Sequence, residues 1–469
     1  MIQSLQEISQ PTRELSGYIA DARRRALPAE VAEKAKQHIL DTVAAMVSGS
    51  GLPPGQAAIA FAASLGGPPE ASVVGTALAT SMINAALING MLAHADETDD
   101  SHAPSRTHPG CAVIPAALAA AERADAGGEA FVKAVALGYD VGARLNYALG
   151  AEEFAAASRS THSFGGTFGA GAAAGALLGI DALQARHLLS YCAQQASGVA
   201  CNVRDSDHIE KAFDFGGMPA RNGATAAAMV AAGFTGVDDV FSGERNFFEA
   251  FSPKPDPAQL MDGLGTRFEI LGTNIKKWCV GSPAQSALDA MTQIVDAIGL
   301  TDADVDKVTI HLPTRSARTV DGAPMPDVNV QHLLAVLLID GKLTFESVHD
   351  HARMKDPQVL ALRKRMRIQP SEELMQARPR RQAIVDVTTR DGVHISRRAV
   401  AVRGTADNPM SRAEIEDKAQ DLMAPILGAA ACAKLIQALR ELETRRSLRE
   451  LRVLWQPPQA AAPPRRSAP

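Results

Sequence analysis

Residues 94–109, HADETDDSHAPSRTHP, constrain the fold of this chain more than any other segment. Three histidines and four acidic residues fall within these sixteen positions, whereas residues 83–92 and 113–120 on either side are almost wholly apolar and small. Charges placed between two core helices are costly unless they are paired or take part in chemistry. We therefore expect two buried helices that hold this segment, which we call the acidic loop, as the floor of an active site.

The length and composition favour a helical protein of more than one domain. A chain of 469 residues exceeds what one hydrophobic core usually spans. Aromatic residues make up only 4% of the chain while small residues are abundant, which favours closely packed helices over an aromatic-rich sandwich. The fold class predicted is mainly α, with a large multihelical domain built from both chain ends and a smaller inserted α+β domain.

Hydrophobic periodicity locates the elements. Helices are expected in the first part of the chain over residues 29–47, 56–65, 81–94, 112–123, 129–149, 170–178, 182–198 and 219–232. The amino end of the 112–123 helix should face the acidic loop and attract an anion. Beyond residue 265 the pattern predicts strands at 267–271 and 307–312, a hairpin over 383–402 with Asp391-Gly392 as its turn, and helices over 284–298, 329–340, 357–365, 411–423 and 429–443.

These elements suggest domain boundaries. We expect the first part of the helical domain over 1–265, the α+β domain over 266–404, returning helices over 405–455 and a disordered tail over 456–469.

Charge and cysteine content exclude several classes of function. A net charge of −5 gives no electrostatic case for nucleic acid or a membrane surface. No apolar run is long enough for a signal peptide or a membrane span. The five cysteines form no CxxC pair, which favours reduced thiols in a cytoplasmic protein. Walker and Rossmann fingerprints are absent, so the sequence indicates no nucleotide or dinucleotide site.

The acidic loop has three interpretations. It could be a helix end with solvated acids, or its carboxylates and imidazoles could bind a divalent ion. All the candidate ligands come from one short segment, however, so we expect no metal. Proton transfer next to a carboxylate instead needs a base, an acid near neutral pKa and cations that hold the substrate. His102 and His108 are the histidines suited to that role.

Three further sites could contribute. Lys211 precedes the apolar run FDFGGMPA and is followed by Arg221, a setting unlike an ordinary exposed lysine and suited to binding a carboxylate. His162 lies in STHSFGG, where a lone histidine is more often structural. Lys276 and Lys277 precede a turn at Gly281, and ordinary solubility is the alternative explanation for them.

Together these motifs resemble the MmgE/PrpD family, which includes 2-methylcitrate dehydratases, cis-aconitate decarboxylases and iminodisuccinate epimerase. The family's DxDDTH stretch followed by HPS or HPG is similar to residues 97–102 with His108-Pro109-Gly110. Its glycine-rich histidine segment resembles the sequence around His162, and its lysine before a glycine and an Ala-rich helix resembles Lys211. The similarity runs from about residue 15 to about residue 451.

The resemblance implies a homodimer whose α+β domain acts as a lid. It also implies a cofactor-independent site between the domains that acts on small di- or tricarboxylates. The chain departs from the family at three positions. Glu97 and Ser101 stand for an aspartate and a threonine, and the histidine that usually follows the Lys-aromatic turn is missing from KKWCVGSPAQSA, residues 276–287.

The sequence therefore predicts a carbon–oxygen lyase that dehydrates a small hydroxy acid similar to 2-methylcitrate. Epimerisation, decarboxylation, a non-catalytic binding protein and a metal-dependent hydrolase are the alternatives. The candidate catalytic residues are His108, Lys211, His162, Asp99, Asp100, Ser101 and His102, and the candidate substrate-binding residues are Glu97, Arg221, Lys276 and Lys277.

Overall fold

The computed structural model describes residues 8–458 and confirms the mainly α fold class. Most of the predicted disordered tail, residues 459–469, lies outside the described residues. In the helical part of the chain the helices are α1 Gln10–Asp21, α2 Ala29–Gly49, α3 Pro53–Leu65, α4 Met82–Ala93, α5 Gly110–Ala124, α6 Gly128–Ala148, α7 Ala151–Ala156, α8 Thr161–Leu178, α9 Ala182–Gln195, α10 Ile209–Ala212, α11 Met218–Ala231 and α12 Phe247–Phe251. A short pair of strands, β1 Ala71–Ser72 and β2 Ala79–Thr80, is antiparallel.

Small residues let the central helices approach closely. A side chain at Gly169 of α8 would lie 2.5 Å from the carbonyl oxygen of Gly138 in α6, so the two backbones are in direct contact there. Helices α5 and α11 pack against α8, and α4 packs in turn against α5 and α11. The Ala- and Gly-rich composition thus produces the tight helical core that surrounds the acidic loop.

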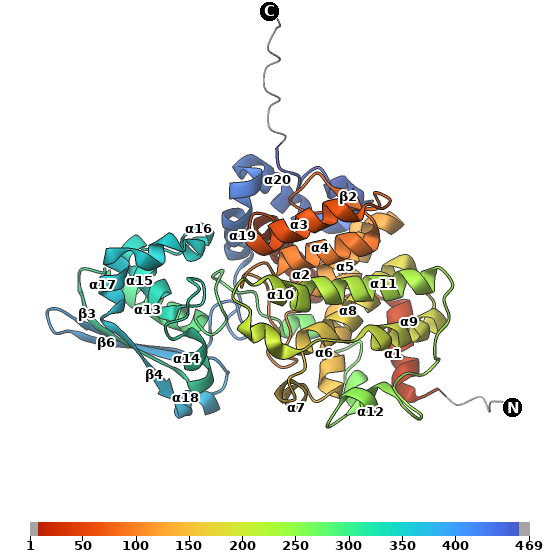
Figure 1. The fold of residues 1–469 in the computed structure, drawn as a ribbon, viewed down its shortest axis with the longest axis horizontal. Helices are drawn as coiled ribbons and strands as arrows, with labels where there is room; N and C mark the ends of the chain where they lie inside the picture. The colour runs from red at the N-terminus through yellow and green to blue at the C-terminus, as the bar shows by residue number, and fades with distance from the viewer. Residues whose placement is uncertain (1–7, 459–469) are drawn as a thin grey trace, which may run out of the picture.

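The chain returns to this bundle at its carboxyl end. Helices α19 Arg412–Leu427 and α20 Ala429–Arg440 lie beside α2, so red-orange and blue segments meet at the top of Figure 1. The buried Lys418 ammonium of α19 donates to Asp41 Oδ1 of α2 (2.6 Å) and to the carbonyl oxygen of Thr98 (3.1 Å). Both ends of the chain therefore support the acidic loop.

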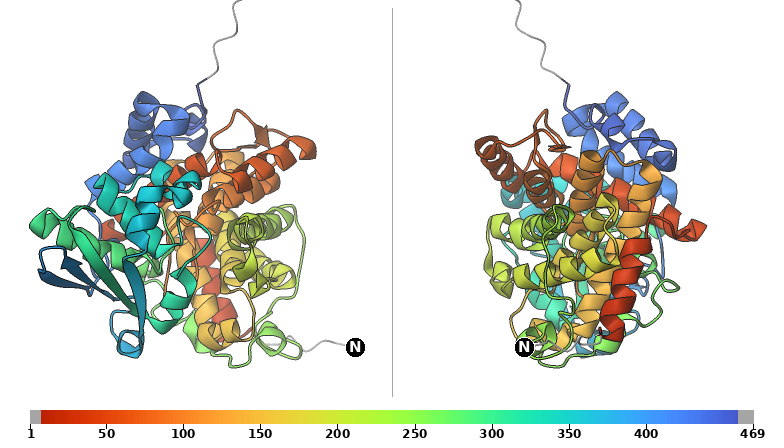
Figure 2. Two further views of the ribbon diagram at one scale, coloured as in Figure 1. Left: turned by 60° about the vertical axis from the view of Figure 1, so that its left-hand side comes forward. Right: turned by 90° about the vertical axis from the view of Figure 1, so that its right-hand side faces the viewer.

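Residues 285–399 form the sheet unit, which lies to one side of the bundle (Figures 1 and 2). Its strands are β3 Val305–Pro313, β4 Met366–Ser371, β5 Ala383–Thr389 and β6 His394–Ala399, in the order β4-β3-β5-β6. Only β3 and β4 are parallel among these pairs. The helices are α13 Gln285–Ile298, α14 Thr314–Val320, α15 Val330–Asp340, α16 Phe345–His349, α17 Pro357–Arg363 and α18 Glu372–Gln376.

The sheet follows from its sequence pattern. One face of β5 is buried in the core. It carries Ala383, Val385 and Val387, which alternate with more exposed residues. The predicted hairpin is confirmed, since β5 and β6 pair around the Asp391-Gly392 turn and Gly392 has φ 88°. That this unit works as a lid stays a prediction.

Two sequence predictions differ from the structure. The strand expected at 267–271 is wrong, because Glu269–Gly272 is a 3-10 turn whose Glu269 N–H donates to the buried Asp140 Oδ1 (2.6 Å). The helix expected to begin at residue 170 begins at Thr161, because Ser160 caps it and accepts from the Ser163 N–H. His162 consequently lies in the first turn of α8.

Within residues 8–458, no helix combines the length and the apolar character that crossing a membrane requires.

Candidate active site

The acidic loop joins α4 to α5 and is almost completely buried. Its two adjacent aspartates have different partners. Asp100 accepts from the Gly110 N–H at the start of α5 (3.0 Å), from the Tyr139 hydroxyl (2.6 Å) and from His38 Nδ1 (2.8 Å). The anion expected at the amino end of this helix is thus Asp100 itself, and these contacts give it a structural role.

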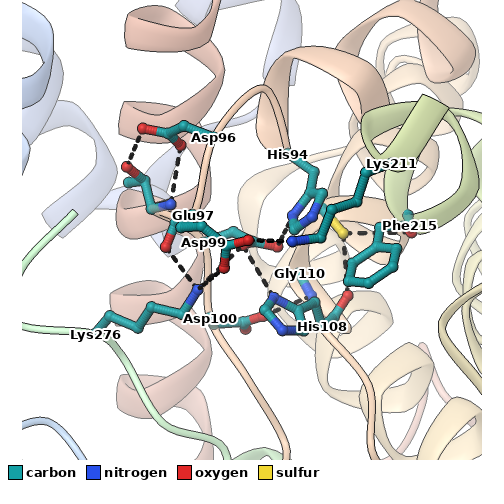
Figure 3. Close-up of polar contacts among 12 residues, drawn as sticks. His94, Asp96, Glu97, Asp99, Asp100, His108, Gly110, Lys211, Phe215 and Lys276 are labelled. Carbon is teal, nitrogen blue, oxygen red and sulfur yellow. Dashed lines mark hydrogen bonds and ion pairs between the residues drawn. The ribbon is translucent and has the colours of Figure 1, made fainter. Parts of the chain in front are cut away.

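Asp99 contacts two imidazoles. Its Oδ1 accepts from His108 Nδ1 (3.0 Å), and its Oδ2 lies 3.0 Å from His94 Nδ1 (Figure 3). Despite burial, the two histidines hold the pKa of Asp99 well below its usual value. Burial lowers the pKa of His108, so the imidazole is neutral at neutral pH. Because Nδ1–H faces Asp99, Nε2 of His108 is left as a base.

Two lysine side chains approach the Glu97 and Asp99 carboxylates from opposite sides (Figure 3). The Lys211 ammonium pairs with Glu97 Oε1. Lys276 donates to the Glu97 carbonyl oxygen (2.6 Å), and its ammonium lies 3.6 Å from Glu97 Oε2 and 3.7 Å from Asp99 Oδ1. Burial opposes the charge on both partners, yet the pKa of Glu97 is well below and that of Lys211 above the usual value because each charge stabilises the other. The site therefore holds two cations beside a neutral base.

A π-helical turn, Phe213–Gly217, places an aromatic ring over the site. The ring of Phe215 stacks on His162 with centroids 3.5 Å apart and on His94 with centroids 4.4 Å apart. Lys211 Nζ lies 5.3 Å from the Phe215 ring centroid. Burial keeps the pKa of His162 well below its usual value, so this imidazole is neutral.

Glycines allow the π-helical turn to reach this position. A side chain at Gly216 would lie 2.0 Å from the Gly90 carbonyl oxygen of α4, a distance that no Cβ tolerates. Asp214 in the same turn accepts from the Ser160 hydroxyl (2.6 Å) and from Asn202 Nδ2 (2.6 Å). The turn is thereby fixed to α4 and to the start of α8, which aligns Phe215 with the histidines.

The turn that carries Lys276 is fixed by backbone bonds. Ser101 and Asn274 exchange both of their backbone hydrogen bonds (3.0 and 2.9 Å). The Ile275 N–H donates to the carbonyl oxygen of Gly404 (3.0 Å), whose φ of 98° suits glycine. Ser101 therefore contributes through its backbone, by joining the acidic loop to the Lys276 turn.

Three predicted residues have other partners. His102 Nδ1 bonds to the Ser105 hydroxyl (2.7 Å) and its Nε2 lies 3.6 Å from Glu269. Arg221 donates to Asn222 Oδ1 (3.1 and 3.0 Å). Lys277 Nζ lies 4.7 Å from the Trp278 ring centroid. The structure thus brings together His108, His162, Lys211, Lys276, Asp99 and Glu97, and gives His102, Arg221 and Lys277 contacts of their own.

The structure adds to the site several residues that were not among the predicted catalytic or substrate-binding residues. They are His94, His208, Phe215, Asp96, Asp327 and His349. His94 and Asp96 belong to the acidic loop and His208 lies three residues before Lys211, so proximity in sequence could have indicated them. Asp327 and His349 come from the sheet unit, more than 200 residues after the acidic loop. No local sequence pattern indicates that they belong to the site.

His349 connects the sheet unit to the acidic loop. Its Nδ1 donates to the Phe345 carbonyl oxygen (2.7 Å), and its Nε2 lies 3.0 Å from Asp96 Oδ2. Burial alone would lower the pKa of His349, but the Asp96 carboxylate outweighs it and raises the pKa to about 9. The imidazolium therefore joins the two parts of the molecule at neutral pH.

Replacing His349 with Gln should lower thermal stability in a pH-dependent way. Since the folded pKa of about 9 exceeds the usual 6.5, the contribution is complete below about pH 6.5 and is lost as the pH rises through about 9. We expect the difference in Tm between wild type and His349→Gln to be largest at the acidic end of this range. A difference that grows with rising pH would contradict the ion pair.

One group of side chains in residues 8–458 has the spacing that could hold a metal ion. It consists of His94, Asp99 and Cys111, whose donor atoms lie within 4.8 Å of one another. The surroundings fit a cation poorly. The Lys276 ammonium is 3.7 Å from Asp99, and burial raises the pKa of Cys111 well above its usual value, which keeps the thiol protonated. A mechanism based on the imidazoles and ammonium groups fits these residues better.

Comparison with known proteins identifies relatives over most of the chain. The cis-aconitate decarboxylase-like protein oryM of Aspergillus oryzae is 24% identical over 94% of this chain and 96% of its own length. Human cis-aconitate decarboxylase is 25% identical over 76% of each chain. Cis-aconitate decarboxylase of Aspergillus terreus is 22% identical over 78% of this chain and 79% of its own.

Family models match the two parts of the chain separately. Residues 13–260 match the MmgE/PrpD N-terminal domain, and residues 278–444 match the MmgE/PrpD C-terminal domain. The first match includes the acidic loop, His162 and Lys211, and the second includes the sheet unit. The chain therefore belongs to the MmgE/PrpD family of enzymes.

Proposed function

We propose that this protein is a cofactor-independent lyase that acts on a small di- or tricarboxylate by proton transfer at a carbon next to a carboxylate. One observation supports the proposal most directly: Asp99 orients the neutral His108 imidazole in a buried site where two lysine ammonium groups pair with Asp99 and Glu97. Family membership supports a lyase, because the relatives named above are decarboxylases or resemble one.

Each group has a role in dehydration. His108 Nε2 removes the proton from the carbon, and the electron pair that is left forms the new double bond as the carbon–oxygen bond breaks. The leaving hydroxyl takes a proton from a general acid and departs as water. Lys276 and Lys211 bind carboxylates of the substrate and stabilise the negative charge that develops on them. Asp99 stabilises the imidazolium that forms on His108. His162 and Phe215 form an apolar wall that excludes water from the reacting carbon.

Decarboxylation is the second candidate, favoured by the names of the relatives. The same residues could carry out decarboxylation, with His108 donating a proton to carbon instead of removing one. A carbon–carbon bond breaks, carbon dioxide leaves, and a protonated His108 returns a proton to the carbanion. Both reactions need a proton-transfer group at the position of His108 and the same cations.

Incubation of the purified protein with a panel of acids, followed by proton NMR in deuterated water, tests the proposal. The panel contains 2-methylcitrate, citrate, malate, cis-aconitate and iminodisuccinate. A new vinylic signal from a hydroxy acid establishes dehydration, and a product one carbon shorter establishes decarboxylation. Deuterium exchange without any new product would replace the lyase with an epimerase, and an unchanged panel would argue for a binding protein.

The cytoplasmic location and the homodimer suggested by the sequence are also proposals. Sedimentation velocity of the purified chain measures the second of these directly.

A further inference from the structure

A backbone segment of the sheet unit lies against the turn from which the family's histidine is missing. Gly281 and Ser282 stand in this part of the turn, which also carries Lys276. The Gly281 N–H donates to the Asp327 carbonyl oxygen (3.0 Å), and a side chain at Gly281 would lie 3.8 Å from that oxygen. The backbone of Asp327 therefore lies directly against the turn that approaches Glu97 and Asp99.

The loop that carries Asp327 is well fixed. The Val328 and Asn329 N–H groups both donate to the Met325 carbonyl oxygen (3.3 and 3.0 Å). Asn329 caps α15, where its Oδ1 accepts from the His332 N–H (2.9 Å) and its Nδ2 donates to the Ala323 carbonyl oxygen (2.7 Å). These bonds fix the backbone on either side of Asp327.

The Asp327 carboxyl group is buried and unpaired. The residue is only 2% exposed. Within residues 8–458 no side chain or backbone group hydrogen-bonds to its carboxyl oxygens, and Oδ2 is fully buried without a partner. A buried carboxylate without partners is strongly unfavourable, whereas a carboxylic acid that meets its partner on substrate binding is not.

The charges around Asp327 come from both parts of the molecule. They are His349 on α16, Asp96 and Glu97 in the acidic loop, and Lys211 on α10. Burial, helped by the two carboxylates and opposed by His349 and Lys211, raises the pKa of Asp327 to about 7. The carboxyl group therefore holds its proton to a higher pH than an ordinary aspartate does.

We propose that Asp327 is the general acid of this site and takes the place of the missing histidine. This inference rests on the proposed lyase function. In dehydration His108 Nε2 takes the proton from carbon, the double bond forms, and the carbon–oxygen bond breaks. The leaving hydroxyl takes the Asp327 proton and departs as water. Asp327 is then a carboxylate and His108 an imidazolium, and transfer of one proton between them through solvent restores the starting state.

Asp327→Asn is the decisive variant, because the amide keeps the shape but cannot deliver the proton. Its turnover should fall by about 10²- to 10⁴-fold, the usual effect of one acid–base group. Exchange of the substrate's carbon-bound hydrogen in deuterated water should persist, since His108 is intact. Asp321→Asn, an exposed aspartate of the same loop region, is the matched control and should leave turnover unchanged.

A second measurement does not depend on activity. In wild type the folded protein holds the Asp327 proton up to about pH 7, whereas the unfolded chain releases it near the usual 3.8. Wild-type stability should therefore fall relative to Asp327→Asn as the pH rises through this window. The Tm difference should shift in favour of the variant between about pH 5 and about pH 8.

The outcomes separate the two proposals. A wild type that turns over no acid overturns the lyase function, and with it the role of Asp327 in catalysis. An active wild type together with a fully active Asp327→Asn overturns only the general acid. Loss of both exchange and turnover in a folded Asp327→Asn would assign it a positioning role instead, and a Tm difference that is independent of pH would show that Asp327 holds no proton.

Discussion

Replacing His108 with Gln is expected to lower turnover by about 10²- to 10⁴-fold while the protein stays folded, because the variant loses the base that Asp99 orients. His108 is the imidazole that pairs with Asp99 and still has 12% of its side chain exposed, whereas His94 is completely buried. Steady-state kinetics on the substrate found in the acid panel measures the loss. Thermal unfolding of the same preparation shows that the fold is intact.

His102→Gln is the matched control for this experiment. The sequence offers both His102 and His108 as histidines suited to proton transfer, with His108 as the expected base. In the structure His102 instead bonds to Ser105 and faces Glu269. Burial lowers the pKa of His102 to about 4. The control should lose some stability and keep turnover within about tenfold, as expected outside the acid–base pair. Loss of turnover in a folded His102→Gln with an active His108→Gln would reverse the assignment.

Replacing Asp100 with Ala should have the largest effect on stability. The carboxylate is completely buried and serves three donors, so its removal leaves His38, Tyr139 and the Gly110 N–H without their acceptor. Removing one partner from a buried charged network typically costs about 3–5 kcal/mol in the free energy of unfolding. Chemical denaturation of wild type and variant measures the difference.

The neighbouring Asp99→Asn is the comparison for that measurement. It keeps the side-chain volume and should remain folded, but it disturbs the orientation of His108 and should lower turnover about 10²-fold or more. The two substitutions one residue apart should thus separate stability from activity. An Asp100→Ala protein as stable as wild type would show that the hydrogen bonds at the start of α5 do not hold the loop.

Much of the fold and part of the site could be predicted from local sequence. The apolar segments around the acidic loop became α4 and α5, and the Asp391-Gly392 turn joined β5 to β6 as expected. Lys211 and His162 stood out because an apolar, glycine-rich context is unusual for them, and both contact the same Phe215 ring. These features depend on periodicity and composition within about one helix, which a sequence carries directly.

The remaining features depend on contacts between distant segments. Asp99 and Asp100 look equivalent in sequence, and only the contacts of Asp100 with Tyr139 and His38 on two other helices distinguish them. The strand expected at 267–271 failed because a tertiary hydrogen bond to Asp140 overrode the local β preference. Asp327 lies 230 residues after Glu97 and joins the site only through the packing of the sheet unit.

The most direct test of the central claim, that His108 transfers a proton to or from carbon, is deuterium incorporation at the carbon next to the substrate carboxylate. Wild type and His108→Gln are incubated in deuterated water with the acid that the panel identifies, and the product and recovered substrate are analysed by NMR. We predict that wild type introduces deuterium at this carbon and that His108→Gln does not. Equal incorporation by the two proteins would show that another group carries the proton and would contradict the mechanism.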